Sequence, residues 1–311
     1  MARPIECLSV IYPTGEQYEI SAGGCTAVVT EVGATLRSLT MGGHDILHGF
    51  AVETSPIGGR GQQLLPWPNR IRDGRYVFDG VTQQLPLSEP ARHNASHGLG
   101  RNVPWVLFDR HPDQVTLRLR IYTQPGWPGI LEARITYTVG QDGLTVDVTA
   151  TNLGPSPLPY GYGAHPYLTV GEKVVDDVTL TIPAASYLAV DDRLLPTELL
   201  PVDKTSFDWR TGRRIADASL DTAFTDLSRD AGGRWEVSVA LADRCTYLWG
   251  DGGTNWVQVF TGGPYRDWSV AVEPMTCGPN AFNEGPTHAD LIVLQPGATT
   301  SCSWGISERP A

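Results

Sequence analysis

The feature that most restricts the fold of this chain is an alternation of apolar and polar residues, which gives a period of two. From residue 115 to residue 122 the order is Val, Thr, Leu, Arg, Leu, Arg, Ile, Tyr. A second alternating stretch ends at Val139, and a third begins at Leu144, after Gly140-Gln-Asp-Gly143. A period of two turns one face of a strand toward the core and the other toward water. The turn sequence between two such stretches therefore predicts a β-hairpin around residues 140–143.

Strand-like segments of this kind occupy most of the chain. Further candidates are residues 25–39, 75–78 and 81–85 (on either side of Asp79-Gly80), 178–182, 235–241, 247–249, 255–261, 269–272 and 289–294. No window longer than about ten residues has the helical period. Many strands at spacings of roughly 8–12 residues are typical of sandwiches and barrels. No linker or change of composition divides the chain. We therefore predict an all-β fold, a large antiparallel β-sandwich with few short helices, in which residues 1–311 form a single domain.

Composition and charge argue against several classes of function. The chain of 311 residues carries a formal net charge of -11 and has a pI near 5.0. This excess of acid argues against binding to nucleic acid or to an anionic membrane surface, and it makes a strongly anionic substrate less favourable. The segment Met1–Cys7 lacks the apolar region of a signal peptide, and no run is long enough to span a membrane. The five cysteines are scattered without a C-x-x-C pair, so we expect reduced thiols, no structural zinc and a cytoplasmic protein.

Glu273 follows the buried-type strand 269–272 and has no lysine or arginine within five residues on either side. Pro274, which has no N–H to donate, is expected to end the strand there. A carboxyl group at the end of an apolar strand has a raised pKa unless it is paired, because burial disfavours its charged form. Such a group suits a general base that works near pH 7. The competing interpretation is a glutamate that leaves the strand and faces water.

Asn69 and Arg70 are presented by the segment 62–72, which two prolines and a tryptophan stiffen. A rigid loop with a planar fork of donors is suited to hold hydroxyl or carboxylate oxygens. An arginine that only ties the loop to a carbonyl is an equally simple interpretation.

Histidines define two further polar segments. His93 and His97 are four residues apart and would share a metal on a helix, but their surroundings are rich in Gly and Asn and contain no evident third ligand. His97 is the better site candidate, because the adjacent Gly98 lets a ligand approach the backbone. His165 lies among glycines and tyrosines in the segment 159–168 and is suited to donate a proton near neutral pH. A core histidine bonded to a carbonyl is the alternative.

Asp221, in Ser219-Leu-Asp-Thr-Ala-Phe-Thr-Asp226, is the last candidate, with a turn aspartate bonded to its own backbone as the competing interpretation. The chain has no G-x-S-x-G motif, no phosphate-binding glycine loop and no dinucleotide fingerprint. The chemistry that remains is proton transfer between one acid and one base, with hydroxyl-binding residues around them.

Seven short motifs resemble, in their order along the chain, those of the aldose 1-epimerase (galactose mutarotase) family. They are Gly-Ala-Thr-Leu at 33–36, Pro-Asn-Arg-Ile at 68–71, His-Gly at 97–98, His-Pro-Tyr at 165–167, Leu-Asp-Thr-Ala-Phe at 220–224, Val-Gln-Val-Phe-Thr-Gly at 257–262 and Val-Glu-Pro-Met-Thr at 272–276. His-Pro-Tyr is followed by Leu168-Thr-Val170, where many members of the family carry Phe-Asn-Leu. The Glu-Pro-Met-Thr form, with Asn280-Ala-Phe after it, resembles a divergent bacterial branch.

This resemblance implies a β-supersandwich with a sugar cleft across one face, without metal or cofactor. It implies a general base at Glu273, a general acid at His165, and sugar-hydroxyl contacts from Arg70, His97 and Asp221, beside which we place Asn69. The expected partner is a monosaccharide, and the protein is expected to be a monomer or homodimer. Candidates to stack on the C–H face of the sugar are Trp67, Trp249 and Tyr162. Independently of the resemblance, Tyr160, Tyr162 and Tyr167 are candidates to stack on an apolar face of a ligand.

Two alternatives stay open at this point. A hexose 6-phosphate epimerase needs cations at the rim of the cleft, for which Arg92, Arg101 and Arg266 are the candidates. A carbohydrate-binding sandwich without catalysis would need neither the acid nor the base.

Overall fold

The computed structural model describes residues 10–169, 171, 175–241, 244–262, 266 and 268–310. The segment Met1–Cys7, Val170 and Asp267 lie outside these residues. The described part is mostly β-strand, as predicted, and its helical elements are short 3-10 turns. These are η1 (Ile57–Gly59), η2 (Pro90–Arg92), η3 (Val175–Asp177) and η5 (His288–Asp290). None of the helical elements in the described ranges is long and apolar enough to cross a bilayer.

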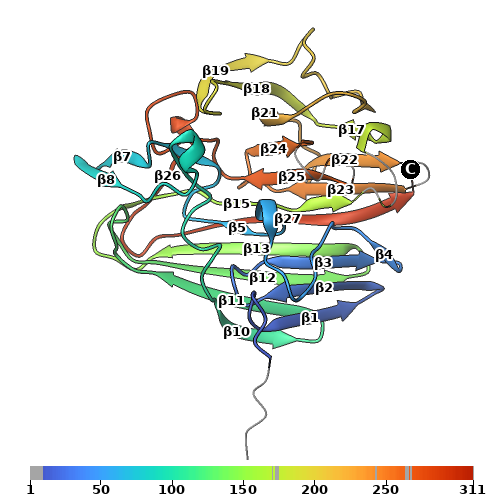
Figure 1. Ribbon diagram of the computed structural model, residues 1–311, viewed down its shortest axis with the longest axis horizontal. Helices are drawn as coiled ribbons and strands as arrows, with labels where there is room; N and C mark the ends of the chain where they lie inside the picture. Colours follow the sequence, from blue (N-terminus) through green and yellow to red (C-terminus); the bar gives the residue numbers. More distant parts are fainter. Residues whose placement is uncertain are drawn as a thin grey trace, which may run out of the picture.

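A nine-stranded antiparallel sheet is the larger of two main sheets, with strand order β10-β11-β12-β13-β27-β23-β22-β17-β20. Its strands are β10 (Val106–His111), β11 (Gln114–Ile121), β12 (Leu131–Gly140), β13 (Gly143–Asn152), β27 (Thr299–Pro310), β23 (Arg244–Gly250), β22 (Trp235–Leu241), β17 (Thr179–Thr181) and β20 (Arg213–Arg214). The hairpin predicted around residues 140–143 is confirmed, because Gly140 pairs with Gly143 at the end of β12 and β13. The C-terminal strand β27 crosses the middle of the molecule, between β13 and β23 (Figure 1).

The second main sheet has the order β19-β18-β21-β24-β25-β15-β5, and β16 also pairs with β25. Its strands are β19 (Pro196–Pro201), β18 (Ala184–Val190), β21 (Asp221–Leu227), β24 (Trp256–Phe260), β25 (Ser269–Met275), β15 (Gly163–Ala164), β16 (Tyr167–Thr169) and β5 (Gln63–Leu64). In Figure 1, β18 and β19 of this sheet lie at the top of the molecule, with β21, β24 and β25 below them. This sheet carries Asp221 and Glu273.

Smaller sheets complete the fold. They are β1 (Gln17–Ala22), β2 (Cys25–Thr30), β3 (Leu36–Met41) and β4 (His44–Asp45); β6 (Arg70–Arg72) with β9 (Asn94–Ser96); β7 (Arg75–Phe78) with β8 (Val81–Gln84); and β14 (Leu158–Tyr160) with β26 (Ile292–Leu294). The hairpin predicted at Asp79-Gly80 is confirmed, and both residues adopt positive φ, as its tight turn requires.

Pro274 does not end its strand, which corrects the sequence-based expectation. β25 continues to Met275, and Pro274 lies opposite a residue of β24. The N–H groups of Val272 and Thr276 both donate toward the β15 and β16 side of the strand. Pro274 lies midway between them, so its missing N–H falls on the same side, where the chain passes from β15 to β16 and the neighbouring ladder is interrupted. A proline is tolerated there because no ladder hydrogen bond is lost.

One hydrophobic cluster joins the two main sheets. It includes Val146 and Trp304 from the nine-stranded sheet and Val257, Val270 and Val272 from the other. These side chains occupy the inner faces of both sheets, as the alternation of strand residues requires. The alternate residues of β24 and β25 are therefore directed away from this core.

Candidate active site

Strand alternation places three polar side chains on one face of the second sheet. In β21, β24 and β25 the core-facing residues include Phe224, Val259 and Val272, so the residues between them face the other way. Asp221, Gln258 and Glu273 occupy such positions. Gln258 pairs directly with Glu273 across β24 and β25, and Asp221 lies two positions along β21 from the residue that pairs with Gln258. The register of three strands thus brings together residues that are up to 52 positions apart in sequence.

Loops supply the opposite side of the site. Asn69 precedes β6, His97 follows β9, and the pairing of Arg70 with Ser96 holds these two strands together. The backbone N–H of His97 donates to the carbonyl of Asn69 at 2.8 Å, and both residues have positive φ, 64° and 52°. His165 lies between β15 and β16, on the flank of β25. The fold therefore gathers all six residues predicted from the sequence.

These residues line one pocket of about 380 Å³. The lining residues are Ile57, Gly58, Asn69, Arg70, His97, His165, Tyr167, Asp221, Gln258, Phe260 and Glu273. A cavity of this size with a few convergent polar groups is typical of a small-molecule site.

His165 and Glu273 face each other inside the pocket. The distance from His165 Nε2 to Glu273 Oε1 is 3.3 Å, and the two side chains are 9% and 3% exposed. The remaining polar atoms, His165 Nδ1 and Glu273 Oε2, are buried without a partner among the described residues. Buried polar atoms of this kind carry a desolvation penalty, which a ligand with hydroxyl groups would relieve.

Burial sets the protonation of this pair. It raises the pKa of Glu273 well above its ordinary value, and the negative charge of Asp221 adds to the rise while Arg70 opposes it. Burial also lowers the pKa of His165 to about 3, with the charges of Arg101 and Arg70 acting in the same direction. The raised pKa expected for Glu273 agrees with this environment. This burial disfavours an imidazolium at His165 and favours a proton on Glu273.

His97 lies beside His165, with ring centroids 5.5 Å apart. Burial lowers the pKa of His97 well below its ordinary value, so this ring is also neutral. Its Nδ1 atom has no partner in the described structure. A Cβ on the adjacent Gly98 would lie 2.0 Å from the carbonyl oxygen of Leu65, so glycine permits a close approach of two backbone segments at this position.

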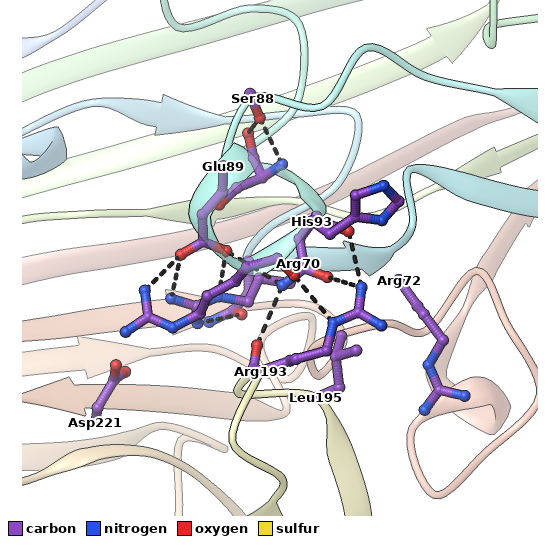
Figure 2. Close-up of polar contacts among 12 residues, drawn as sticks. Arg70, Arg72, Ser88, Glu89, His93, Arg193, Leu195 and Asp221 are labelled. Atoms are coloured by element: carbon purple, nitrogen blue, oxygen red, sulfur yellow. Dashed lines mark hydrogen bonds and ion pairs between the residues drawn. The ribbon is translucent and has the colours of Figure 1, made fainter.

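Arg70 is oriented by a glutamate that the sequence did not reveal. Its Nε and Nη2 atoms donate to Glu89 Oε2 at 2.9 Å and Oε1 at 3.1 Å, and Nη1 donates to Asn69 Oδ1 at 3.2 Å (Figure 2). Glu89 lies beside η2, 19 residues from Arg70, in a segment without periodicity. No local pattern marks such a contact, because the pairing of β6 with β9 creates it.

Asp221 is a strand residue and not a turn residue bonded to its own backbone. It begins β21 and accepts a hydrogen bond from Gln258 Nε2 at 2.6 Å. Gln258 was not predicted as a site residue, although it stands in the Val-Gln-Val-Phe-Thr-Gly motif. Its Oε1 atom is buried without a partner in the described structure, so it offers an acceptor to the pocket.

The candidates for stacking on a sugar are mostly placed elsewhere. Trp67 packs edge-on against Phe282, and Trp249 lies in β23 of the other sheet. Tyr162 is buried in the core, where it donates to Gln63, and Tyr160 is buried as well. Tyr167 is the exception. It lines the pocket and stacks on the ring of His165, with centroids 5.1 Å apart and an interplanar angle of 4°. Phe260, which the sequence did not single out, is the other aromatic side chain in the lining.

None of the candidate cations for a phosphate group lines the pocket. Arg92 donates to Glu89 at 3.0 Å. Arg266 donates to Asp176 at 2.7 Å and to several backbone carbonyls. Arg101 is close enough for its charge to lower the pKa of both pocket histidines, but it stands outside the lining.

His93 and His97 do not share a site. His93 Nδ1 lies 2.9 Å from Asp73 on the surface, whereas His97 is in the pocket. Within the described ranges, no group of three or more His, Cys, Asp or Glu side chains is arranged to hold a metal ion.

Comparison with known proteins assigns the family. Residues 16–307 match the sequence model of the aldose 1-epimerase family. The chain belongs to the aldose 1-epimerase family. It is 32% identical over 296 residues to the uncharacterized protein YihR of Escherichia coli (strain K12), a match that covers 94% of each chain. Within this family it is also 33% identical to the galactose mutarotase of Rattus norvegicus over 152 residues, 46% of this chain and 42% of the rat protein. It is 31% identical to the aldose 1-epimerase of E. coli over 166 residues, 51% and 47% of the two chains.

Solved structures confirm the fold of this aldose 1-epimerase family member. A galactose mutarotase-like protein from Clostridium acetobutylicum superposes with a TM-score of 0.85 over 94% of this chain and 95% of the other, at 18% identity. A GalM/aldose epimerase homologue from C. elegans gives a TM-score of 0.82 over 95% and 99%, at 20% identity. The predicted mutarotase-like β-sandwich is thereby confirmed.

Proposed function

We propose that this protein is an aldose 1-epimerase that interconverts the α and β anomers of a free hexose. The observation that carries the proposal is the pair His165 and Glu273, whose Nε2 and Oε1 atoms face each other at 3.3 Å in one buried pocket. Family membership supports the reaction class. The surrounding Arg70, His97 and Asp221 supply donors and acceptors for sugar hydroxyls.

The reaction needs one base and one acid. Glu273, as carboxylate, removes the proton from the hydroxyl on C1 while His165 gives a proton to the ring oxygen. The C1–O5 bond breaks, a C1=O1 bond forms, and the sugar opens to the free aldehyde. Rotation about C1–C2 presents the other face, and ring closure reverses both proton transfers. Each positioned group contributes about 10²- to 10⁴-fold to the rate.

These roles require the proton of the pair to move when the sugar binds. The raised pKa of Glu273 and the lowered pKa of His165 favour the proton on Glu273 before the sugar makes its contacts. A sugar hydroxyl that donates to Glu273 stabilises the carboxylate, and a ring oxygen that accepts from His165 stabilises the imidazolium. Since the two groups are coupled, pH-rate profiles will report macroscopic values of the pair.

The charge of the pocket favours a neutral sugar over a hexose phosphate. Among the described lining residues, Arg70 is the one arginine or lysine, and Glu89 is bound to it. Asp221 adds a carboxylate. The one cationic side chain of the described lining is therefore already paired with a carboxylate and is not available to neutralise a phosphate group.

Polarimetry tests the proposal. Fresh α-anomers of glucose, galactose and glucose 6-phosphate are followed with and without protein, and faster mutarotation of a neutral sugar is expected. Replacing Glu273 by Gln should reduce turnover by at least about 10²-fold while sugar affinity, measured by calorimetry, is retained. A wild-type protein that binds sugar and gives no rate above buffer would instead be a carbohydrate-binding module, and faster turnover of glucose 6-phosphate would favour the phosphate epimerase.

A further inference from the structure

We propose that Glu89 is a positioning and specificity residue, which fixes Arg70 in the pocket wall and cancels its charge, so that the wall accepts neutral hydroxyl groups and disfavours anions. This inference rests on the proposed sugar site but not on its catalytic chemistry. Glu89 does not itself line the pocket, so it acts through Arg70.

The contacts of Arg70 determine which donors remain for a ligand. A guanidinium has five N–H groups in a rigid plane. Glu89 takes two of them in a bidentate pair, and the side chain of Asn69 takes a third. The bidentate pair fixes the orientation of the plane as well as its position. Two N–H groups are then left to a ligand, and Arg70 is in the pocket lining.

Burial makes the charge of Glu89 effective. The side chains of Arg70 and Glu89 are 12% and 19% exposed, so water screens their interaction only in part. Burial opposes ionisation of Glu89, but the hydrogen bond and charge of Arg70, with further hydrogen bonds from Asn94 and Arg92, outweigh it and lower the pKa of Glu89. Glu89 is therefore ionised at neutral pH, and its pair with Arg70 carries no net charge.

A second set of contacts holds Glu89 in place (Figure 2). Asn94 Nδ2 donates to Glu89 Oε2 at 3.2 Å and to the carbonyl of Arg193 at 3.1 Å. Arg193 in turn donates to Asp73 Oδ1 at 2.8 Å and to the carbonyls of Arg92 and His93. Arg193 lies in the turn between β18 and β19, and β18 pairs with β21, which begins with Asp221. These contacts connect the Arg70 wall of the pocket with the Asp221 wall.

The test compares two sugars that differ in one charge. Methyl glucoside and methyl glucuronide cannot open their rings, so calorimetry measures their binding whether or not the protein is an epimerase. At low ionic strength, the wild type should bind the glucoside more tightly. Glu89→Gln keeps the shape of the side chain and removes its charge. We expect about tenfold weaker binding of the glucoside and unchanged or tighter binding of the glucuronide, in keeping with the loss of one charge-assisted pair.

Two further variants separate charge, geometry and stability. Glu132→Gln is the matched control, because Glu132 of β12 is a buried carboxylate outside the pocket, held by Arg120 of β11 and Arg134 of β12. It should leave both affinities unchanged. Glu89→Asp keeps the charge and shortens the side chain. It should therefore weaken binding of the glucoside and keep the preference for the glucoside over the glucuronide. Three outcomes would overturn the proposal. Glu89→Gln could lose the same affinity for both sugars, it could leave both affinities unchanged, or the wild type could fail to prefer the glucoside.

Discussion

At the scale of the residue, the decisive feature is a glutamate whose carboxyl group is held in a buried pocket beside a histidine. Its side chain is 3% exposed, and its Oε2 atom has no partner in the described structure. Burial disfavours the carboxylate and the imidazolium alike, so it favours a neutral carboxyl group beside a neutral imidazole over two opposite charges. The folded protein therefore carries the desolvation free energy of these buried polar atoms, and a sugar with hydroxyl donors can offset it.

The raised pKa of Glu273 predicts how stability responds to pH. Its contribution to stability is fully present below the unfolded pKa of about 4.3 and is lost as pH rises through the folded value. Glu273→Gln removes this loss. The free energy of unfolding of the variant, relative to wild type, should therefore increase between pH 5 and pH 7, by up to about 1.4 kcal/mol for each pH unit. Urea denaturation at pH 5, 6 and 7 measures it.

Glu132→Gln provides the contrast for this measurement. Burial opposes ionisation of Glu132, but hydrogen bonds from Arg120 and Arg134 outweigh it and lower its pKa. The stabilisation from Glu132 is present above the unfolded pKa and is lost as pH falls through the folded one. Glu132→Gln should be less stable than wild type by a constant amount from pH 5 to pH 7. A relative stability of Glu273→Gln that is also constant over this range would contradict the buried, protonated Glu273.

At the scale of the element, the site depends on strands and turns that take exact positions relative to their neighbours. β25 continues through Pro274 because the ladder beside it is interrupted between β15 and β16, and the same interruption is where His165 lies. The 3-10 turn η1 then covers this histidine with backbone. Gly59, at the end of η1, has a φ of 78°, and a Cβ there would lie 3.1 Å from His165 Cδ2.

Gly59→Ala is expected to lower both stability and turnover. The left-handed backbone costs an alanine about 1–2 kcal/mol, and the added methyl group displaces the imidazole from Glu273. Gly233→Ala is the matched control, because Gly233 has a φ of 81° and a Cβ added there would meet no described neighbour within 4 Å. Thermal unfolding should show a similar loss of stability in both variants, and polarimetry should show reduced turnover in Gly59→Ala alone. Equal turnover in the two variants would mean that η1 does not hold His165 in place.

At the scale of the whole molecule, two sheets share one core, and a chain of hydrogen bonds runs through it. Trp304 of β27 donates to the hydroxyl of Tyr162 at 2.8 Å, and Tyr162 donates to Gln63 of β5 at 2.5 Å. All three side chains are fully buried. The chain joins the nine-stranded sheet to the sheet that carries the catalytic candidates.

Trp304→Phe should destabilise the protein without altering the site. The smaller ring leaves a cavity and removes a buried donor, which together cost about 2–4 kcal/mol. Guanidinium denaturation measures this loss, and polarimetry should show an unchanged KM. Trp268→Phe, at a ring that is 49% exposed, serves as the control and should change stability little. A large increase in KM for Trp304→Phe would show that the core connection also shapes the pocket.

Much of the fold follows from local pattern. The strands around Gly140-Gln-Asp-Gly143 and Asp79-Gly80 were predictable, because alternation and turn residues act within a few positions. The end of β25 was not predictable, because Pro274 is tolerated only where the neighbouring ladder is interrupted between β15 and β16. In the same way, the sequence suggested Arg70 as a donor but concealed Glu89, whose contact depends on the pairing of β6 with β9.

By itself, the sequence determined that the chain forms strands and predicted which residues are candidates for the site, because residue type and period are local properties. Tertiary structure alone decided that Asp221, Gln258 and Glu273 share one face, that Tyr167 and not Tyr162 borders the pocket, and that burial raises the pKa of Glu273. Register and burial are the physical reason, since both arise only when distant segments pack together and exclude water.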